Sequence, residues 1–247
     1  MLQRVVHPSG LVAYRSPALA KLGVVHAFST RIGPGGVELD LREPGAQTLV
    51  ALRECAGTHE ALPLCAMKQV HGAVVHELGS QVPAGIEGDA WVSSRSDRLA
   101  LVYTADCVPV LVASADGKRV AAIHAGWRGL VAEVIPAALR ALGAPPAIAA
   151  IGPCLSRSSC EMGPEVAEQF RAVGLEACIH QRAGARPYVD LREAARMQLE
   201  RAGCTTIDVS DRCTYEHADE LPSHRREVTH GGQPRSGRIG ALIAARA

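Results

Sequence analysis

The stretch that most constrains the fold runs from residue 104 to residue 129 and reads TADCVPVLVASADGKRVAAIHAGWRG. Within it, two apolar runs at 108–114 and 119–125 flank the dipeptide Asp116-Gly117. Asp-Gly between alternating apolar residues is the strongest short-range signal for a β-hairpin, because a type I′ turn needs a positive φ at both central residues. The sequence therefore predicts two antiparallel strands joined by a tight turn.

The register of this hairpin places a cysteine close to a histidine. If the Asp-Gly dipeptide forms the turn, His124 faces Pro109 and Cys107 faces Gly126. The side chains of Cys107 and His124 then share one face and lie about 7–8 Å apart on the diagonal. A metal ion with ligand bonds of roughly 2.0–2.3 Å fits between them, and so does a direct Cys–His hydrogen bond. Pro109 cannot donate to a ladder, which indicates an edge strand or a bulge.

Further strands and three helices are predicted around the hairpin. Short β-branched runs at 11–16, 24–30, 73–78, 99–104, 147–152 and 206–210 read as strands. Helical patterns cover 129–143, 163–174 and 189–203, and Pro136 is expected to kink or split the first of them. Because hairpin and crossover connections alternate, we expect one α/β (α+β) domain over residues 1–247, with mixed sheets flanked by helices.

The charge and composition exclude several classes of partner. The net charge is +1, from 26 basic and 25 acidic residues that are interspersed, and aromatic residues make up only 3%. Such a chain lacks both the basic patch and the stacking surfaces of a nucleic-acid-binding protein. No signal peptide is visible, and no segment reaches the roughly 18 apolar residues of a membrane span. We therefore expect a cytoplasmic protein that binds a small molecule, with no nucleic-acid or membrane partner; the sequence leaves its oligomeric state open.

The eight cysteines are scattered and form no Cys-x-x-Cys pair. In a reducing compartment most of them are expected to be small buried apolar residues, so a structural Cys107 is the simpler interpretation of that residue alone. A third chemical residue near the hairpin would favour a functional site. His71, in MKQVHG (67–72), is one candidate, although spacing alone does not select it from the ten histidines.

Eight fragments follow one another along the chain: KQVHG (68–72), GDAWVS (88–93), TADCVPVLV (104–112), AAIHAGWRGL (121–130), IGPC (151–154), CTY (213–215), SHRR (223–226) and SGRIGALI (236–243). Taken together and in this order, they resemble the YfiH/laccase-domain family. The resemblance covers roughly residues 24–243 and implies a layered α/β/β/α sandwich of the YfiH-like type, a fold related to that of a toxin with a Cys–His dyad.

The resemblance implies a zinc site. In that family the histidine of QVHG, the cysteine of ADC and the histidine of IHAGW hold the ion, and these positions are His71, Cys107 and His124 here. Three protein ligands leave a fourth position open, as a catalytic zinc requires, and coordination keeps Cys107 as a thiolate. Copper is the alternative metal, because divalent copper binds nitrogen and sulfur ligands more tightly.

The resemblance also implies chemistry on purine nucleosides. Similar proteins are assigned phosphorolysis of adenosine, inosine and methylthioadenosine to the base and ribose 1-phosphate, as well as adenosine deamination. In deamination a zinc-bound water attacks the purine, and Asp106 is the first candidate to carry protons, although Asp106 also suits a turn.

Basic and polar residues near these motifs are candidates to bind the substrate. Guanidinium groups bind phosphate bidentately, which makes Arg31, Arg128 and the pair Arg225-Arg226 candidate phosphate ligands. Lys68 and Gln69 lie on the approach to His71 and are expected to contact the nucleoside, unless Gln69 orients the metal ligand instead.

Three segments depart from the family pattern. The stretch 38–55 lacks the usual Asn-Leu-Gly and Asn-Arg elements, Cys160–Gly163 replaces a Tyr-Glu-Val-Gly stretch, and Leu221-Pro222 replaces aromatic residues before SHRR. These departures are expected to alter the wall of the substrate pocket while leaving the three metal ligands intact.

The sequence is also compatible with three other classes of function. A metal-free cysteine hydrolase would use Cys107 as nucleophile and His124 as base, with His71 orienting them. A copper-dependent polyphenol oxidoreductase fits less well, because it needs several copper centres and the sequence contains no His-x-His pair. A non-enzymatic metal-binding or partner-binding module is the third alternative.

Overall fold

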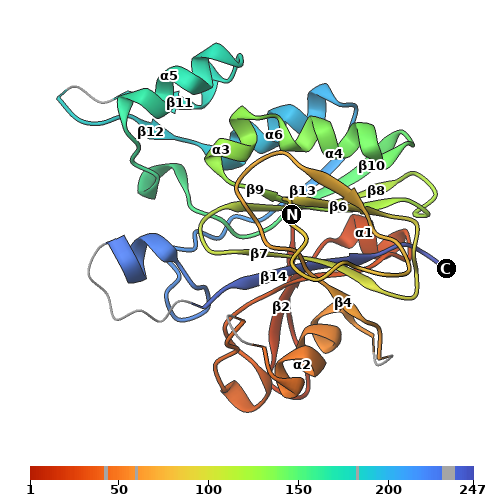
Figure 1. Ribbon diagram of the computed structural model, residues 1–247. Helices are drawn as coiled ribbons and strands as arrows, with labels where there is room; N and C mark the ends of the chain where they lie inside the picture. Colours follow the sequence, from red (N-terminus) through yellow and green to blue (C-terminus); the bar gives the residue numbers. More distant parts are fainter. Residues whose placement is uncertain (42–43, 59–60, 182–183, 230–236) are drawn as a thin grey trace.

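Two six-stranded sheets stacked face to face form the centre of the molecule (Figure 1). The computed structural model describes residues 1–41, 44–58, 61–181, 184–229 and 237–247. The first sheet has the order β1-β2-β3-β14-β7-β4 and the second the order β13-β10-β8-β9-β6-β5. Each sheet mixes parallel and antiparallel pairs, as predicted.

The strands of the first sheet are β1 (Gln3–Val6), β2 (Val12–Arg15), β3 (Val25–Ser29), β4 (Leu64–Cys65), β7 (Leu99–Thr104) and β14 (Ile239–Ala244). Those of the second are β5 (Val75–Glu77), β6 (Ala90–Ser93), β8 (Val108–Ser114), β9 (Val120–Ala125), β10 (Pro146–Ile151) and β13 (Thr206–Val209). A separate pair is formed by β11 (Ile179–His180) and β12 (Tyr188–Val189).

Helices cover the outer faces of both sheets (Figure 1). On the second sheet lie α3 (Trp127–Val131), α4 (Val134–Leu142) and α6 (Leu191–Arg201), and on the first lies α2 (Ala46–Ala56). The remaining helical segments are α1 (Pro17–Lys21), α5 (Pro164–Ala172), η1 (Pro34–Gly36), η2 (Arg157–Ser159), η3 (Glu176–Cys178) and η4 (Arg225–Thr229).

Three apolar clusters separate these layers. One lies between the sheets and includes Phe28, Val102 and Leu111. A second packs Val110 and other residues of the second sheet against α4 and α6, and a third packs the first sheet against α2. Because β8 contributes to clusters on both of its faces, all seven of its residues are buried. The α/β/β/α sandwich is confirmed, whereas the assignment of residues 1–247 to one domain stays a prediction.

The register of the β8–β9 hairpin is confirmed, but its predicted turn type is wrong. Pro109 pairs with His124, as the sequence indicates. The turn is a four-residue loop in which the Gly117 N–H donates to the Ser114 carbonyl, and Gly117 has a φ of 72° whereas Asp116 does not have a positive φ. Two-residue and four-residue loops with the same midpoint give the same strand pairing, so the error in the turn left the register unchanged.

Pro109 lies in a central strand, between β10 and β9, rather than at an edge. Its missing N–H is tolerated because it falls at the end of the β8–β10 ladder, where the Pro109 carbonyl accepts from the Gly152 N–H. The backbone N–H of His124, its partner on β9, donates to the Asp89 carbonyl instead of to β8. A proline at this position therefore costs the sheet little.

The helix predicted over 129–143 is split, as Pro136 suggested. It forms α3 and α4, and the break is at Glu133, whose φ is 59°. Pro136 is the third residue of α4, where an N–H has no acceptor within the helix. The helices predicted over 163–174 and 189–203 are confirmed as α5 and α6.

Several elements have no counterpart among the predicted strands and helices, notably β6, β14 and α2. The strand β14 is near the end of the chain, yet it lies between β3 and β7 in the first sheet and all six of its residues are buried. None of the helices in the described part of the chain combines the length and apolarity needed to cross a membrane.

Candidate metal centre

The side chains of His71, Cys107 and His124 converge at one end of the β8–β9 hairpin. One possible ligand atom from each residue lies within 4.8 Å of those of the other two. Within the described ranges, this is the one group of three or more His, Cys, Asp or Glu side chains placed to share a metal ion. The three residues predicted to be ligands are therefore brought together, although His71 lies 36 positions before Cys107 in the sequence.

Local backbone geometry explains how these side chains meet. Cys107 precedes β8 and His124 lies on β9, so the hairpin register brings them together. His71 lies in the loop between β4 and β5 and adopts a left-handed φ of 60°. The edge of one imidazole ring faces the other, with centroids 4.8 Å apart and an interplanar angle of 84°.

Gly126 leaves space beside the three ligands. A Cβ atom at this position would lie 3.0 Å from Cys107 Sγ and 3.1 Å from His71 Cδ2, so a side chain here would crowd the donor atoms. A sulfur and two imidazole nitrogens form a donor set of the kind that zinc accepts. The set is also compatible with copper, so the identity of the metal stays a prediction.

Asp89 contacts this candidate centre and was not among the residues predicted from the sequence. It is completely buried, and its Oδ1 lies 2.8 Å from Nδ1 of His124. This contact leaves Nε2 as the ring nitrogen of His124 that is available to a metal. A signal was present in the sequence, because GDAWVS (88–93) is one of the family fragments and Asp89 comes directly before an apolar strand.

The electrostatic environment favours a thiolate–imidazolium pair when no metal is bound. Burial raises the pKa of the Cys107 thiol, but the charge of His124 and hydrogen bonds from His124 and His71 outweigh burial and lower this pKa to about 6. Burial also lowers the pKa of His124, whereas Cys107 and Asp89 raise it to about 9. The proton thus resides on the imidazole rather than on the sulfur at neutral pH.

This proton placement predicts an unusual pH profile for alkylation. In metal-free protein, Cys107 should react with iodoacetamide at a rate that rises through a midpoint near pH 6 instead of pH 9, because the thiolate is the nucleophile. Mass spectrometry of the peptide containing Cys107, over pH 5–10, measures the rate. Cys55 serves as the internal control, because it is buried and burial raises the pKa of its thiol to about 12. A midpoint for Cys107 above pH 8 would contradict the charge pair.

The three donors line a cavity of about 640 Å³. Of the predicted substrate-binding residues, Lys68 and Gln69 line it. The Gln69 amide donates to the Tyr103 carbonyl at 2.7 Å and accepts from the Tyr103 N–H at 2.7 Å, so it fixes the loop that carries His71. Lys68 is exposed and bonds to Glu87 at 2.6 Å. The remaining lining residues are Met67, Tyr103, Thr104, Ala105, Asp106, Trp127, Leu155, Met162, Leu191, His224, Arg225 and Arg238.

Asp106 lines the cavity, but other groups occupy both of its carboxylate oxygens. The Thr214 hydroxyl donates to Oδ1 and the Arg225 backbone N–H donates to Oδ2, each at 2.6 Å. Its φ of 85° marks a tight turn immediately before Cys107. These contacts tie Cys107 to the segment around Arg225, and the proton-transfer role of Asp106 stays a prediction.

Arg31 and Arg128, the first candidates for a phosphate site, are not among the residues that line this cavity. Arg31 donates to Glu227 and to the Ala218 carbonyl, each at 2.7 Å, so both terminal nitrogens of its guanidinium are engaged. Arg128 is exposed and stacks on Trp127, with its Cζ 4.4 Å from the ring centroid. The cavity instead contains Arg225, which was predicted as one of a pair, and Arg238, which was not predicted.

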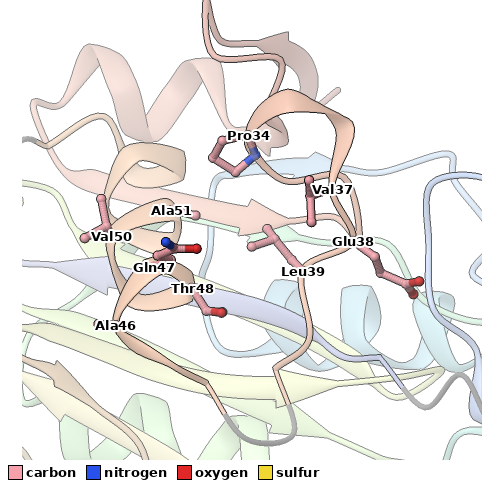
Figure 2. A pocket seen from close by; sticks show the side chains of 9 residues that line it. All are labelled: Pro34, Val37, Glu38, Leu39, Ala46, Gln47, Thr48, Val50 and Ala51. Atoms are coloured by element: carbon pink, nitrogen blue, oxygen red, sulfur yellow. The ribbon is translucent and has the colours of Figure 1, made fainter.

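The segments that depart from the family pattern lie in different parts of the structure. Met162, from the altered stretch 160–163, lines the metal cavity. In the described residues, the segment 38–55 instead contributes to a second pocket, between η1 and α2 (Figure 2). That pocket is lined by Pro34, Val37, Glu38, Leu39, Ala46, Gln47, Thr48, Val50 and Ala51. The expectation that 38–55 shapes the wall around the metal ligands is therefore wrong for its described residues.

Residues 38–246 match the family described as multi-copper polyphenol oxidoreductase laccase. The chain belongs to this family. A laccase-domain relative from Deinococcus radiodurans, named purine nucleoside phosphorylase, is 38% identical over 250 residues and covers 95% of this chain and 93% of its own. The Escherichia coli purine nucleoside phosphorylase YfiH is 36% identical over 228 residues, covering 91% and 92%.

Solved structures share the fold of this chain. A Neisseria meningitidis protein of family DUF152 superposes with a TM-score of 0.78 at 27% identity, covering 100% of this chain and 99% of its own. YlmD from Geobacillus stearothermophilus gives 0.81 at 23% identity over 99% and 100%, which shows the shared fold. The resemblance of the sequence fragments to the YfiH-like family is thereby confirmed.

Proposed function

We propose that this laccase-domain protein is a metal-dependent purine nucleoside phosphorylase, which cleaves a nucleoside with phosphate to the free base and ribose 1-phosphate. The observation that carries the proposal is one cavity that holds both the His71–Cys107–His124 donor set and the cationic side chains of Arg225 and Arg238. Relatives that match more than nine-tenths of the chain are named purine nucleoside phosphorylases, which supports this choice of reaction.

The cavity offers suitable side chains to both substrates, phosphate and the nucleoside. Arg225, Arg238 and Lys68 offer cations to phosphate, and a guanidinium binds it bidentately. Trp127, Met162 and other apolar side chains offer a surface to the purine ring. Zinc, when held by His71, Cys107 and His124, supplies Lewis-acid chemistry to a substrate oxygen. Among the described residues one donor set is placed to hold such an ion, which supports zinc chemistry over a several-copper oxidase.

The nucleosides we propose as substrates are adenosine, inosine and methylthioadenosine. We propose adenosine deamination as a second activity of the same site. Deamination needs a group that carries protons, and Asp106 is the carboxylate that lines the cavity, with its two oxygens accepting hydrogen bonds from Thr214 and Arg225. Release of ammonia from adenosine without phosphate would measure that activity separately from phosphorolysis.

A metal-free cysteine hydrolase is the second candidate, and one observation favours it. Asp89 contacts Nδ1 of His124, and His124 in turn raises the thiolate character of Cys107, which is the order of a Cys–His–Asp triad. The orienting residue would then be Asp89 and not His71. Chelation separates the two candidates, because it stops a metal-dependent enzyme and leaves a cysteine hydrolase active.

Arg238→Ala tests the phosphorylase proposal. Arg238 is exposed at the cavity, so its replacement should leave the fold intact and raise the KM for phosphate about ten-fold to a hundred-fold. This range corresponds to the loss of one charge-assisted hydrogen bond of about 1.5–3 kcal/mol. The KM for inosine should change little. Steady-state release of hypoxanthine at varied phosphate concentration measures both constants.

The matched control is Arg171→Ala, an exposed arginine on α5 that pairs with Glu168 outside the cavity. It should leave both KM values unchanged. If the wild-type, zinc-loaded protein releases no base from inosine at saturating phosphate, the proposed function is wrong. If Arg238→Ala leaves the phosphate KM unchanged, Arg238 is not a phosphate ligand.

A further inference from the structure

One buried carboxylate contacts both histidines of the candidate metal centre. Asp89 comes directly before β6 and is 0% exposed. Its backbone N–H donates to the Val74 carbonyl, which fixes the residue beside the loop that carries His71. The contacts of its side chain decide how the two histidines are held.

The contact with His124 acts on the imidazole ring. Oδ1 of Asp89 lies 2.8 Å from Nδ1, and the Asp89 carbonyl accepts from the His124 backbone N–H at 2.8 Å. The backbone and the ring of His124 are thus fixed to one residue. A hydrogen bond at Nδ1 sets the rotation of the ring and directs Nε2 toward Cys107.

The contact with His71 acts on the backbone. Oδ1 of Asp89 also accepts from the His71 N–H at 2.9 Å, and Oδ2 accepts from the Gly72 N–H at 2.7 Å. These two bonds hold the loop in the left-handed conformation of His71, at a φ of 60°. A histidine in this conformation requires such external support, because residues other than glycine are strained in the left-handed region.

We infer that Asp89 is a positioning residue that preorganises two of the three metal ligands at once, His124 through its ring and His71 through its backbone. The inference rests on the proposed metal centre and goes beyond the orienting role that a Cys–His–Asp triad would assign to Asp89. A triad needs only the bond to His124, whereas a metal centre needs both histidines in place.

Asp89→Asn separates these roles with little change of shape. An asparagine that keeps its oxygen toward Nδ1 of His124 must point its NH2 group at the Gly72 N–H, where two donors oppose each other across 2.7 Å. The bond to His124 survives and the loop carrying His71 is displaced. The variant therefore disturbs the metal centre at His71 and leaves the pair of Cys107 and His124 in place.

The experiment measures metal binding rather than turnover. Zinc affinity is determined by competition with a chromophoric chelator, and cobalt(II) serves as a spectroscopic probe of the ligands. Asp89→Asn should weaken zinc binding about 10-fold to 100-fold, and should alter the ligand-field bands of bound cobalt while retaining the Cys107 charge-transfer band. Asp208→Asn is the matched control, because Asp208 also accepts bonds on both oxygens, from Ser16, Ala18 and the N-terminus. It should match the parent in both readouts.

A second measurement needs no variant, which keeps the inference testable if Asp89→Asn does not fold. NMR of zinc-loaded wild-type protein labelled with ¹⁵N-histidine should show a proton on Nδ1 of His124 and zinc on its Nε2. Zinc on Nδ1, or zinc affinity and cobalt bands of Asp89→Asn equal to those of the parent, would overturn the inference. Absence of stoichiometric zinc from the parent itself would instead count against the proposed metal centre.

Discussion

Replacing Cys107 with alanine should remove zinc from the protein and with it the phosphorolysis of purine nucleosides. The thiolate is one of three protein donors within 4.8 Å of one another, and alanine offers no donor atom. Zinc bound by four ligands in small domains is held by about 10–16 kcal/mol, so one ligand accounts for roughly 3–4 kcal/mol. The affinity should therefore fall by about two to three orders of magnitude, measured by chelator competition and by metal analysis of protein purified without added metal.

His71→Ala distinguishes the metal centre from a Cys–His–Asp triad, because the metal centre needs His71 and the triad does not. It should lower the zinc content as strongly as Cys107→Ala. Cys204→Ala, at a buried cysteine after α6 that is not one of the three donors, should keep full zinc and activity. Full zinc occupancy in His71→Ala would contradict the assignment of the three ligands. Turnover that survives chelation would instead establish the cysteine hydrolase.

Replacing Arg31 with methionine should destabilise the fold by about 3 kcal/mol, at the lower end of the cost of breaking a buried ion pair. Its guanidinium lies 2.7 Å from Glu227 Oε1, and the two side chains are 10% and 6% exposed. Arg226 also contacts this oxygen, at 2.9 Å, which limits the loss. Methionine keeps the apolar stem of the side chain and removes only the charge and its hydrogen bonds. Urea unfolding measures the change in the free energy of unfolding.

The control for Arg31→Met is Arg171→Met, which breaks an exposed pair with Glu168 and should cost less than about 1 kcal/mol. Adding Glu227→Gln to Arg31→Met should restore part of the lost stability, because no unpaired carboxylate is then buried. An Arg31 variant with unchanged stability and a raised KM for phosphate would show that Arg31 binds substrate, as the sequence suggested, and is not a structural ion pair.

Local sequence signals were sufficient to predict the features that depend on neighbouring residues. The apolar runs on either side of Asp116-Gly117 predicted the pairing of Pro109 with His124, because the midpoint of a hairpin fixes its register whatever the length of the loop. Pro136 likewise indicated that the helix over 129–143 is interrupted, and the glycines after α5 and α6 marked the ends of those helices. The turn type was wrong, because Ser114 and Asp116 bond to the loop backbone and stabilise a longer turn.

Contacts between distant segments were beyond such signals. The sequence did not show that Asp89 would contact both His71 and His124, since nothing in a single sequence pairs a carboxylate with residues 18 and 35 positions away. It also could not distinguish an arginine that lines a cavity from one that closes an ion pair. No local pattern separates Arg31 from Arg238, and only the position of η4 beside the residues that follow β3 gives Arg31 a buried carboxylate partner, Glu227.

The sequence by itself thus determined the β8–β9 hairpin, the placement of Cys107 and His124 on one face of it, and the family through fragments that recur in order. These features depend on alternation, turns and spacing, which are properties of neighbouring residues. The family resemblance had already implied His71 as the third ligand, whereas tertiary structure alone decided that Asp89 contacts both histidines and that Arg225 and Arg238 share their cavity. Those outcomes depend on which loops and strands the two stacked sheets bring together, and that is set by burial across the whole core rather than by any local pattern.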